Sequence, residues 1–236
     1  MSRIVGVDVG GTFTDLAFFD EATRRFSTAK APSNRGDEAV GFIEGLRRGG
    51  PIAGLDAIVH GTTVGTNALL ERKGAKVGVL TTQGFRDVLE MRRRDRPHTW
   101  GLWGDFVPLT PRRLRLEIAQ RTPADGAIPP PVDPREVRRA CRALLDEGAQ
   151  ALAIVFVNAY ADATNEKAAY AAAREVWPND HICHSAQILP EMREFERAST
   201  TALNAYLQPV VAGYLGKLDA ALEREAFKGS FHIVQS

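Results

Sequence analysis

Short apolar runs alternate with longer stretches of helical periodicity along most of this chain, and that alternation restricts the fold more than any other feature. Residues 56–60, 76–82 and 151–157 are apolar runs of strand length, and segments with helical periodicity lie between and after them. Strands that alternate with helices in this way are typical of an α/β layer. The sequence therefore predicts an α/β fold with a sizeable core.

The N-terminal residues follow a different pattern, that of a β-meander. Three short runs, residues 3–9, 16–20 and 25–31, are separated by the turn-forming segments GGTFTD and EATR. We expect these three strands to pair antiparallel. The complete sheet is then mixed, with an antiparallel N-terminal edge.

The middle of the chain contains the best candidate linker. Residues 92–113 mix charge, Trp, Gly and Pro without a period, which predicts a long ordered loop, and RLRLEIAQRT then alternates as a strand. The segment PADGAIPPPVD that follows is rich in turn-forming residues. We therefore expect a first lobe over residues 1–122 and a second α/β portion over residues 133–236.

Helical periodicity is clearest in the second portion. Apolar side chains recur at helical spacing from Val137 to Leu144, which predicts a helix over 134–147 that ends at Gly148. Further helices are expected over 162–176 and 191–226, and further strands over 181–189 and 230–236. We expect the long C-terminal helix to kink at Pro209, because proline removes a helical hydrogen bond.

Charge and cysteine content exclude several classes of function. The 30 basic and 29 acidic side chains nearly balance, so no global field would attract nucleic acid or an anionic membrane. Only two cysteines occur, which is too few for a disulfide framework and indicates a reducing compartment. No apolar stretch approaches the length of a membrane span. These features favour a cytoplasmic protein whose partners are small molecules or other proteins.

The segment DVGGTFTD at residues 8–15 combines an acid, two glycines and two hydroxyls within a predicted hairpin turn. Glycines at Gly10 and Gly11 tolerate positive φ, so backbone N–H groups there can converge on an anion. Thr12 and Thr14 would add hydroxyl donors, and the Asp8 carboxylate would bind Mg²⁺, which prefers oxygen ligands. The set suits a metal-bound polyphosphate. A glycine hairpin in which Asp8 and Asp15 only cap the turn remains the alternative.

A second cluster follows the predicted strand at residues 56–60. His60 ends this strand, and Gly61, Thr62 and Thr63 open a helix, whose N-terminus favours an anion. Capping of the helix by one threonine is the simpler alternative, although it leaves Thr66 and Asn67 unexplained. For His60 a structural role is likewise left open.

Three segments together resemble a known family. DVGGTFTD, HGTTVGTNALLERKGAKVGVLTTQGFRDVLEMRR and ILPEMREFERASTTALNAYLQPVVAGYL are similar, in this order and spacing, to the hydantoinase A/5-oxoprolinase N-terminal region. The resemblance covers nearly the whole chain and implies an actin-like ATPase (ribonuclease H-like) fold. It also implies ATP and Mg²⁺ as cofactors of a hydrolase that phosphorylates the carbonyl of a cyclic amide, such as a hydantoin or 5-oxoproline, to activate it.

Site residues are implied by the same resemblance, motif by motif. The residues that match the phosphate-binding hairpin are Asp8, which would also hold the metal, Gly10, Gly11, Thr12, Thr14 and Asp15. The residues that match the motif beside the reaction site are His60, Gly61, Thr62, Thr63, Thr66 and Asn67, and of these we expect His60, Thr62 and Thr63, with Asp8, to be catalytic. The later signatures are matched by Arg86, Asp87 and Glu90, and by Glu191, Arg193, Glu194, Glu196 and Arg197.

We expect five side chains to contact the substrate: Thr66, Asn67, Arg86, Arg92 and Glu194. Alternatives stay open for Arg92 and Glu194. Arg92 belongs to an arginine-rich run that would either grip an anion or form a solvated loop. Glu194 lies among acids and arginines whose spacing also makes ordinary pairs on a helix surface.

The resemblance also sets limits. Many relatives have a histidine-serine pair where this chain has Val157 and Asn158, so a role for that histidine is not carried over. Family members continue into a second actin-like half, so we expect the 236-residue chain alone to have an incomplete ATP site and to be inactive. That half and a B-type subunit or domain are the implied partners, and a homo-oligomer is left open. The alternative functions are a ketone carboxylase subunit, an actin-like sugar or acyl kinase, and a truncated module that only binds a partner.

Overall fold

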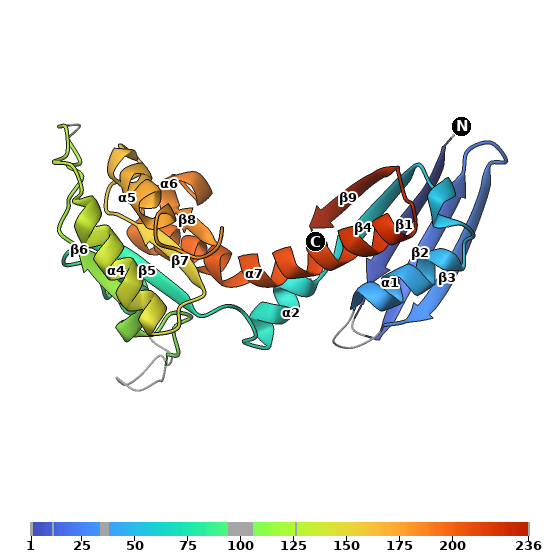
Figure 1. Ribbon diagram of the computed structural model, residues 1–236, viewed down its shortest axis with the longest axis horizontal. Coiled ribbons are helices and arrows are strands. Elements are labelled where there is room, and N and C mark those ends of the chain that lie inside the picture. Colours follow the sequence, from blue (N-terminus) through green and yellow to red (C-terminus); the bar gives the residue numbers. More distant parts are fainter. Residues whose placement is uncertain (1, 11, 34–37, 94–105, 126, 236) are drawn as a thin grey trace. The chain divides into compact units, whose positions relative to one another are not determined.

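The chain forms two compact units, each built around its own sheet (Figure 1). The computed structural model describes residues 2–10, 12–33, 38–93, 106–125 and 127–235. The first unit comprises residues 1–73 and 210–236, and the second comprises residues 74–209. The first unit is therefore discontinuous in sequence, whereas the second is a single stretch.

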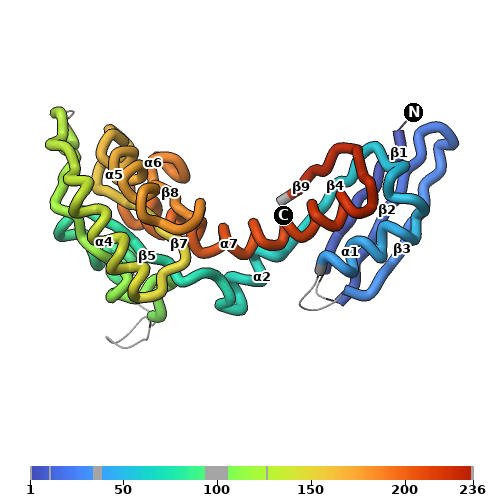
Figure 2. The backbone as a smooth tube through the Cα atoms, in the orientation of Figure 1, coloured from blue at the N-terminus to red at the C-terminus, as the bar shows by residue number. Residues whose placement is uncertain are grey.

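A five-stranded mixed sheet with the order β3-β2-β1-β4-β9 forms the first unit. Its strands are β1 (Arg3–Val9), β2 (Phe13–Asp20), β3 (Arg25–Pro32), β4 (Ala57–Thr62) and β9 (Ser230–Gln235). The first three strands pair antiparallel, whereas β4 runs parallel to β1 and β9 runs parallel to β4. The predicted meander and mixed sheet are confirmed, and Figure 2 shows β9 from the end of the chain beside β4.

One face of this sheet carries the core of the first unit. Its helices are α1 (Glu38–Arg47), the short 3₁₀ helix η1 (Ile52–Gly54), α2 (Val64–Leu70) and the C-terminal part of α7 (Glu194–Arg224). Alternate residues of β1, from Val5 to Val9, are buried in one cluster with Phe42 of α1 and Leu218 of α7. Because strand side chains alternate between faces, Asp8 lies on the opposite, open face.

The second unit contains a four-stranded sheet in which every pair is parallel. Its order is β6-β5-β7-β8, with β5 (Val77–Thr82), β6 (Arg115–Ile118), β7 (Ala151–Val155) and β8 (Ile182–His184). Every residue of β5 and β7 is buried. Strands covered on both faces are expected in a parallel sheet that helices enclose.

Several helices accompany this sheet. They are α3 (Val88–Met91), the 3₁₀ helix η2 (Arg112–Leu114), α4 (Pro134–Asp146), α5 (Thr164–Arg174), α6 (Ser185–Ile188) and the N-terminal part of α7. Among them α4 begins and ends at residues with clear local signals. The Asp133 carboxylate accepts a 2.8 Å bond from the backbone N–H of Arg135 at the start of α4, and Gly148 follows its end at φ +79°. The α4 predicted from the sequence is therefore confirmed.

Two boundaries differ from the expectations. The run over 181–189 is a strand only to His184, because Ser185 and Ala186 bind the Glu166 carboxylate and start α6 there. Helix α7 begins at Glu194 rather than at residue 191; it includes Pro209, and the kink expected there stays a prediction. Much of the loop expected over 92–113 lies outside the described residues, so that expectation also stays a prediction.

The division of the chain also differs from the sequence-based one. The segment expected to link two lobes, residues 123–132, lies inside the second unit. The reason is that β5 pairs with both β6 and β7, which places residues before and after that segment in one sheet. Within the described part of the chain, no helix combines the length and apolarity that crossing a membrane requires.

Candidate functional site

The two motifs singled out in the sequence meet at the carboxyl ends of β1 and β4 in the first unit. In the parallel register of these strands, Asp8 lies opposite Gly61 and Val9 lies opposite Thr62. In the antiparallel register of the hairpin, Asp15 lies opposite Asp8. The parallel pairing thus brings segments about fifty residues apart in sequence to one edge of the sheet.

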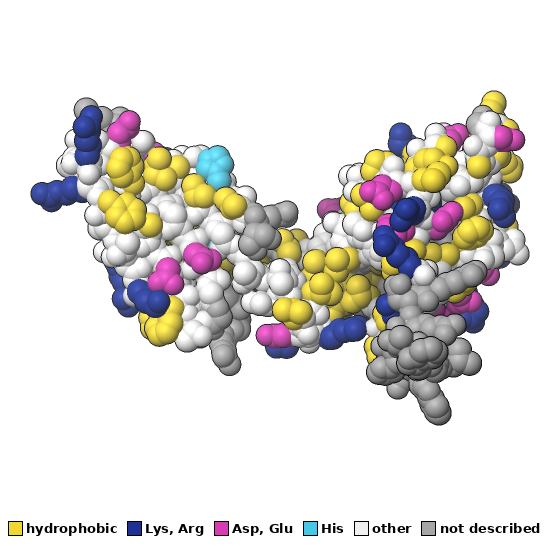
Figure 3. All heavy atoms as spheres, turned by 180° about the vertical axis from the view of Figure 1, so that it is seen from behind, with side chains coloured by type: hydrophobic (Ala, Val, Ile, Leu, Met, Phe, Trp, Pro, Cys, Tyr) yellow, Lys and Arg dark blue, Asp and Glu magenta, His cyan; other side chains and the backbone are white. Residues whose placement is uncertain are grey.

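Two carboxylates lie next to each other on the open face at this edge. Asp8 is exposed, and Asp15 is exposed and contacts Lys30 of β3 at 3.1 Å between Nζ and Oδ1. A methyl group added at Gly61 would lie 3.8 Å from Asp8 Oδ1, so the glycine leaves the side of the carboxylate open. Figure 3 shows the first unit from the side opposite to that of Figure 1; hydrophobic side chains gather in the middle of this face, and acidic and basic side chains lie toward both of its ends.

The hairpin turn uses several of its predicted donors internally. The backbone N–H of Gly10 donates to the Phe13 carbonyl at 3.0 Å, and Gly10 does not adopt positive φ. The Thr14 hydroxyl is buried and lies 3.2 Å from the Ser33 hydroxyl, which donates to the Gly10 carbonyl at 2.7 Å. Of the two threonines, Thr12 alone is exposed.

Gly11 lies outside the described residues, so its predicted positive φ stays a prediction. Ser33, which fastens the turn, was not identified from the sequence. No local signal marks it, because its partners lie about twenty residues earlier in the chain.

The second motif is partly explained by helix capping. The Thr62 hydroxyl accepts from the backbone N–H of Val64 at 3.2 Å, as the simpler alternative proposed. The Asn67 amide donates to the Thr63 hydroxyl at 3.3 Å, one turn away. Thr66 and Asn67 are exposed, so both remain accessible to a ligand at the start of α2.

The geometry supports the structural alternative for His60. Its side chain is fully buried, Nδ1 lies 3.1 Å from the Val7 carbonyl and Nε2 lies 2.8 Å from the Tyr214 hydroxyl. Because a carbonyl only accepts, Nδ1 carries the proton and Nε2 accepts from Tyr214. The rings of Phe42 and Phe231 enclose the imidazole, and burial lowers its pKa below the usual 6.5. A catalytic role for this buried, fully bonded group finds no support.

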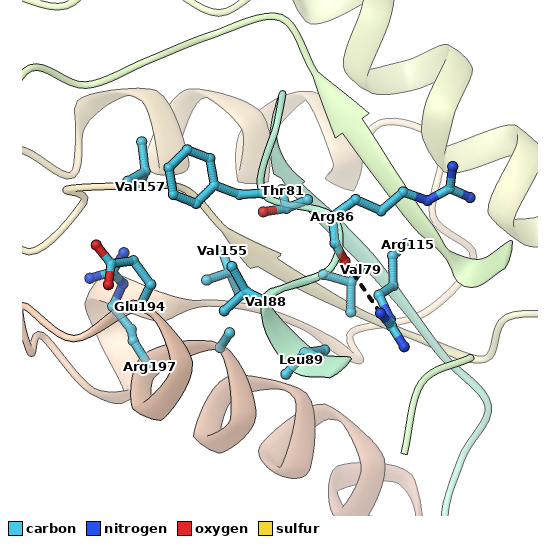
Figure 4. A pocket seen from close by; sticks show the side chains of 12 residues that line it. Val79, Thr81, Arg86, Val88, Leu89, Arg115, Val155, Val157, Glu194 and Arg197 are labelled. Atoms are coloured by element: carbon cyan, nitrogen blue, oxygen red, sulfur yellow. Dashed lines mark hydrogen bonds between the residues drawn. The ribbon is translucent and has the colours of Figure 1, made fainter. Parts of the chain in front are cut away.

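The predicted substrate residues divide between the two units. Thr66 and Asn67 belong to the first, and Arg86, Arg92 and Glu194 belong to the second. Arg86 and Glu194 line one cavity, which Figure 4 shows, although the Arg86 guanidinium donates to the Arg112 carbonyl at 3.0 Å. The guanidinium of Arg92 lies 4.7 Å from the centre of the Phe106 ring.

Arg197 of the EMREFER signature is a buried structural group, a role that the sequence did not indicate. Its guanidinium donates to the Phe156 carbonyl, the Glu191 carbonyl and the Ser185 hydroxyl, at 2.7, 2.7 and 3.0 Å. The Glu166 carboxylate accepts from the same hydroxyl at 2.6 Å. Arg197 therefore ties the end of β7 to α6 and α7.

One pair of that signature fits the helix-surface alternative, because Arg193 lies 3.9 Å from the carboxylate of Glu196, three residues on. The same carboxylate also pairs with Arg93, which is distant in sequence. The earlier signature contributes a second buried arginine cluster, because Asp87 and Glu90 both face the buried Arg115. Nothing in the local sequence marked Arg115, since an arginine in an alternating strand is normally solvent-exposed.

The described residues contain no group of three His, Cys, Asp or Glu side chains able to hold a metal ion by themselves. Mg²⁺ does not need such a group, because it is usually bound through one or two carboxylates together with water and phosphate oxygens. The exposed Asp8 carboxylate, with Asp15 opposite it, fits that requirement.

With this geometry established, comparison with known proteins gives the family. The sequence model of the hydantoinase/oxoprolinase N-terminal region matches residues 4–177, and the chain belongs to this family. The resemblance stated from the motifs is therefore confirmed.

Two relatives and one solved structure illustrate the family. The chain is 35% identical to caprolactamase subunit alpha of Pseudomonas jessenii, over 93% of this chain and 33% of that protein. It is 29% identical to the acetophenone carboxylase gamma subunit of Aromatoleum aromaticum, over 98% of this chain and 35% of the relative. The crystal structure of the ATP-dependent caprolactamase from Pseudomonas jessenii superposes with a TM-score of 0.87 at 33% identity, over 98% of this chain and 35% of that one. The chain thus spans about a third of each.

Proposed function

We propose that this chain forms the N-terminal portion of an ATP-dependent enzyme that opens a cyclic amide after phosphorylation of its carbonyl oxygen. The observation that carries the proposal is the register of β1, β2 and β4, which gathers Asp8, Asp15, Gly61 and Thr62 at one sheet edge. The similarity to a caprolactamase subunit, whose crystal structure is described as ATP-dependent, supports the reaction class.

The residues at this edge would have different roles in binding the metal and the phosphates. The Asp8 carboxylate would hold Mg²⁺, with Asp15 opposite it and the open side at Gly61 leaving room for water and phosphate oxygens. Exposed Thr12 would donate its hydroxyl to a phosphate oxygen. When bound, magnesium ATP would supply the phosphoryl group that converts an inert carbonyl into a better electrophile.

Further subunits and an actin-like ATPase architecture belong to the same proposal. The caprolactamase and acetophenone carboxylase relatives are both subunits by name, so we propose that this chain also works with a second subunit, in the cytoplasm. Residues 1–236 would be the N-terminal region of the longer protein, in which the two units are parts of one family domain.

The Asp8→Asn substitution tests the phosphate role in the full-length enzyme that carries this region. An amide is a much weaker magnesium ligand than a carboxylate, so we expect Mg²⁺-dependent ATP turnover to fall by at least about a hundredfold while the fold is kept. Asp219→Asn is the matched control, because Asp219 is an exposed carboxylate of the same unit on α7. Turnover of Asp8→Asn within about threefold of the control would refute the role.

Ketone carboxylation is the alternative, favoured by the similarity to a carboxylase subunit. Both reactions activate a carbonyl oxygen, so the Asp8 experiment does not separate them. A comparison of ATP consumption in the presence of δ-valerolactam with ATP consumption in the presence of acetophenone and bicarbonate separates the two reactions. We expect δ-valerolactam to stimulate ATP turnover and acetophenone with bicarbonate not to do so.

A further inference from the structure

Ser33, the residue directly after β3, contacts the hairpin turn through both its backbone and its side chain. Its backbone N–H donates to the Thr12 carbonyl at 2.9 Å, and its hydroxyl donates to the Gly10 carbonyl at 2.7 Å. The first bond extends the antiparallel pairing of β2 and β3 by one residue beyond the pair formed by Phe13 and Pro32. Ser33 lies outside all three motifs that gave the family resemblance.

The hydroxyls of Thr14 and Ser33 form a directed chain of hydrogen bonds. A hydroxyl carries one hydrogen, and Ser33 gives its own to the Gly10 carbonyl. The Thr14 hydroxyl, 3.2 Å away, therefore donates to Ser33 Oγ. Hydrogen bonds in such a chain polarise and strengthen one another. Thr14 is fully buried, whereas Thr12 is exposed.

The hairpin itself does not need the Ser33 hydroxyl in order to close. Strands β1 and β2 pair as far as Val9 and Thr14, and beyond them the Gly10 N–H donates to the Phe13 carbonyl at 3.0 Å. Short hairpin connections are closed by such bonds between their own two strands. The additional tie from the end of a third strand indicates that the turn has a task besides joining β1 to β2.

The bonds to Ser33 also occupy the acceptors of the turn. Gly10 and Thr12 give their carbonyls to Ser33, and the Phe13 carbonyl accepts from the Gly10 N–H. A carbonyl oxygen carries partial negative charge and repels a phosphate oxygen, whereas N–H and O–H groups attract it. With the carbonyls of these described turn residues engaged inside the chain, the exposed Thr12 hydroxyl is the side-chain group that the turn offers to an anion.

We propose that Ser33 is a positioning residue for phosphate binding. It holds the Gly10 and Thr12 carbonyls in place, so that the Thr12 hydroxyl meets a phosphate oxygen of magnesium ATP. Thr14 acts through Ser33 and does not touch the phosphate itself. The identity of the ligand rests on the proposed function, whereas the order that Ser33 gives to the turn does not depend on it.

The order of the turn is tested without ligand, by amide hydrogen exchange of the ¹⁵N-labelled 236-residue chain. The double variant Thr14→Val/Ser33→Ala removes both hydroxyls, so no buried donor is left without a partner and the urea midpoint should stay near that of the wild type. The Gly10 amide should nevertheless exchange at least about tenfold faster. The amide of Ala17, in the middle of β2 between two paired strands, should keep its rate.

The phosphate role is tested in the full-length enzyme that carries this region, by calorimetric titration with magnesium ATP. Ser33→Ala should raise the dissociation constant at least about tenfold, as loss of a group that supports a ligand-binding residue does. Ser33→Thr keeps the hydroxyl and should stay within about threefold of the wild type. Ser27→Ala, at an exposed serine of the same β3, is the matched control and should leave the affinity unchanged.

The double variant separates the roles of Thr14 and Ser33. If Thr14 acts only through Ser33, Thr14→Val/Ser33→Ala binds magnesium ATP no more weakly than Ser33→Ala alone, because both substitutions break one chain of bonds. Losses of affinity that add would mean that the Thr14 hydroxyl contacts the phosphate directly, which contradicts the proposal.

Two further outcomes would overturn the role of Ser33. One is wild-type exchange of the Gly10 amide in the double variant, and the other is wild-type affinity of Ser33→Ala for magnesium ATP. Loss of turnover in Asp8→Asn together with unchanged affinity in Ser33→Ala would refute this inference alone and leave the proposed function standing. A wild-type enzyme that does not bind magnesium ATP would refute both.

Discussion

At the scale of single residues, burial decides what His60 can do. The imidazole is enclosed by aromatic rings and bonded through both nitrogens to Val7 and Tyr214, and its pKa is lowered chiefly by loss of solvation. In the unfolded chain the same group titrates near 6.5. The unfolded state therefore binds the proton first as the pH falls.

This linkage predicts the pH dependence of stability. The contribution of His60 is fully present above about pH 6.5 and is lost as the pH falls toward its lower native pKa, by at most about 1.4 kcal/mol per pH unit. In urea unfolding, the free energy of unfolding should fall more between pH 7.5 and pH 5.5 for the wild type than for His60→Gln, because glutamine does not titrate. An equal fall in both proteins would contradict a buried neutral His60.

Part of this arrangement follows from sequence and part does not. The alternation of Val5, Val7 and Val9 already places Asp8 on the opposite face, and the hairpin register that aligns Asp8 with Asp15 makes Thr14 face inward. The partner of His60, Tyr214, is 154 residues away in sequence, and no local pattern predicts that contact. The burial of Arg115 was not predicted for the same reason, because its carboxylate partners come from a different element.

At the scale of elements, predictions succeeded where the signals are local. Helix α4 was found because its cap, apolar stripe and terminal glycine all lie within its own segment. The end of β8 was missed because Glu166 of α5, a distant side chain, fixes it by binding Ser185 and Ala186. Where tertiary contacts set a boundary, propensity cannot place it.

Strand β9 depends on a glycine at its entry. A methyl group at Gly229 would lie 2.4 Å from the Asp56 carbonyl oxygen, and that oxygen also accepts the Ser230 N–H bond that starts the β4–β9 pairing. Gly229→Ala should therefore cost about 1–3 kcal/mol of stability in urea unfolding, because backbone must move.

Gly213 provides the matched control, since it is an exposed glycine inside α7 with open space around its Cα. Gly213→Ala should raise stability by about 0.5–1 kcal/mol, through helix propensity alone. If both substitutions changed the free energy of unfolding in the same direction, the close approach of Gly229 to the Asp56 carbonyl would not matter for β9.

At the scale of the whole molecule, the two units differ in how their cores are assembled. The core of the second unit, from Leu80 to Ile182, comes from one continuous stretch. The core of the first unit combines strands near the N-terminus with Tyr214, Leu218 and Leu222 of α7, and its sheet ends in β9. The sequence could not show this, because composition marks a break only at residues 123–132.

This difference predicts which parts fold alone. Residues 74–209 contain their whole sheet and core, so this fragment should unfold cooperatively in urea, as followed by circular dichroism. Residues 1–73 lack β9, the α7 side chains and the Tyr214 hydroxyl that bonds His60, so they should show no cooperative transition. A fusion of 1–73 to 210–236 through a flexible linker is the control and should restore the transition. Cooperative unfolding of 1–73 by itself would mean that the C-terminal segment only covers a core that is already complete.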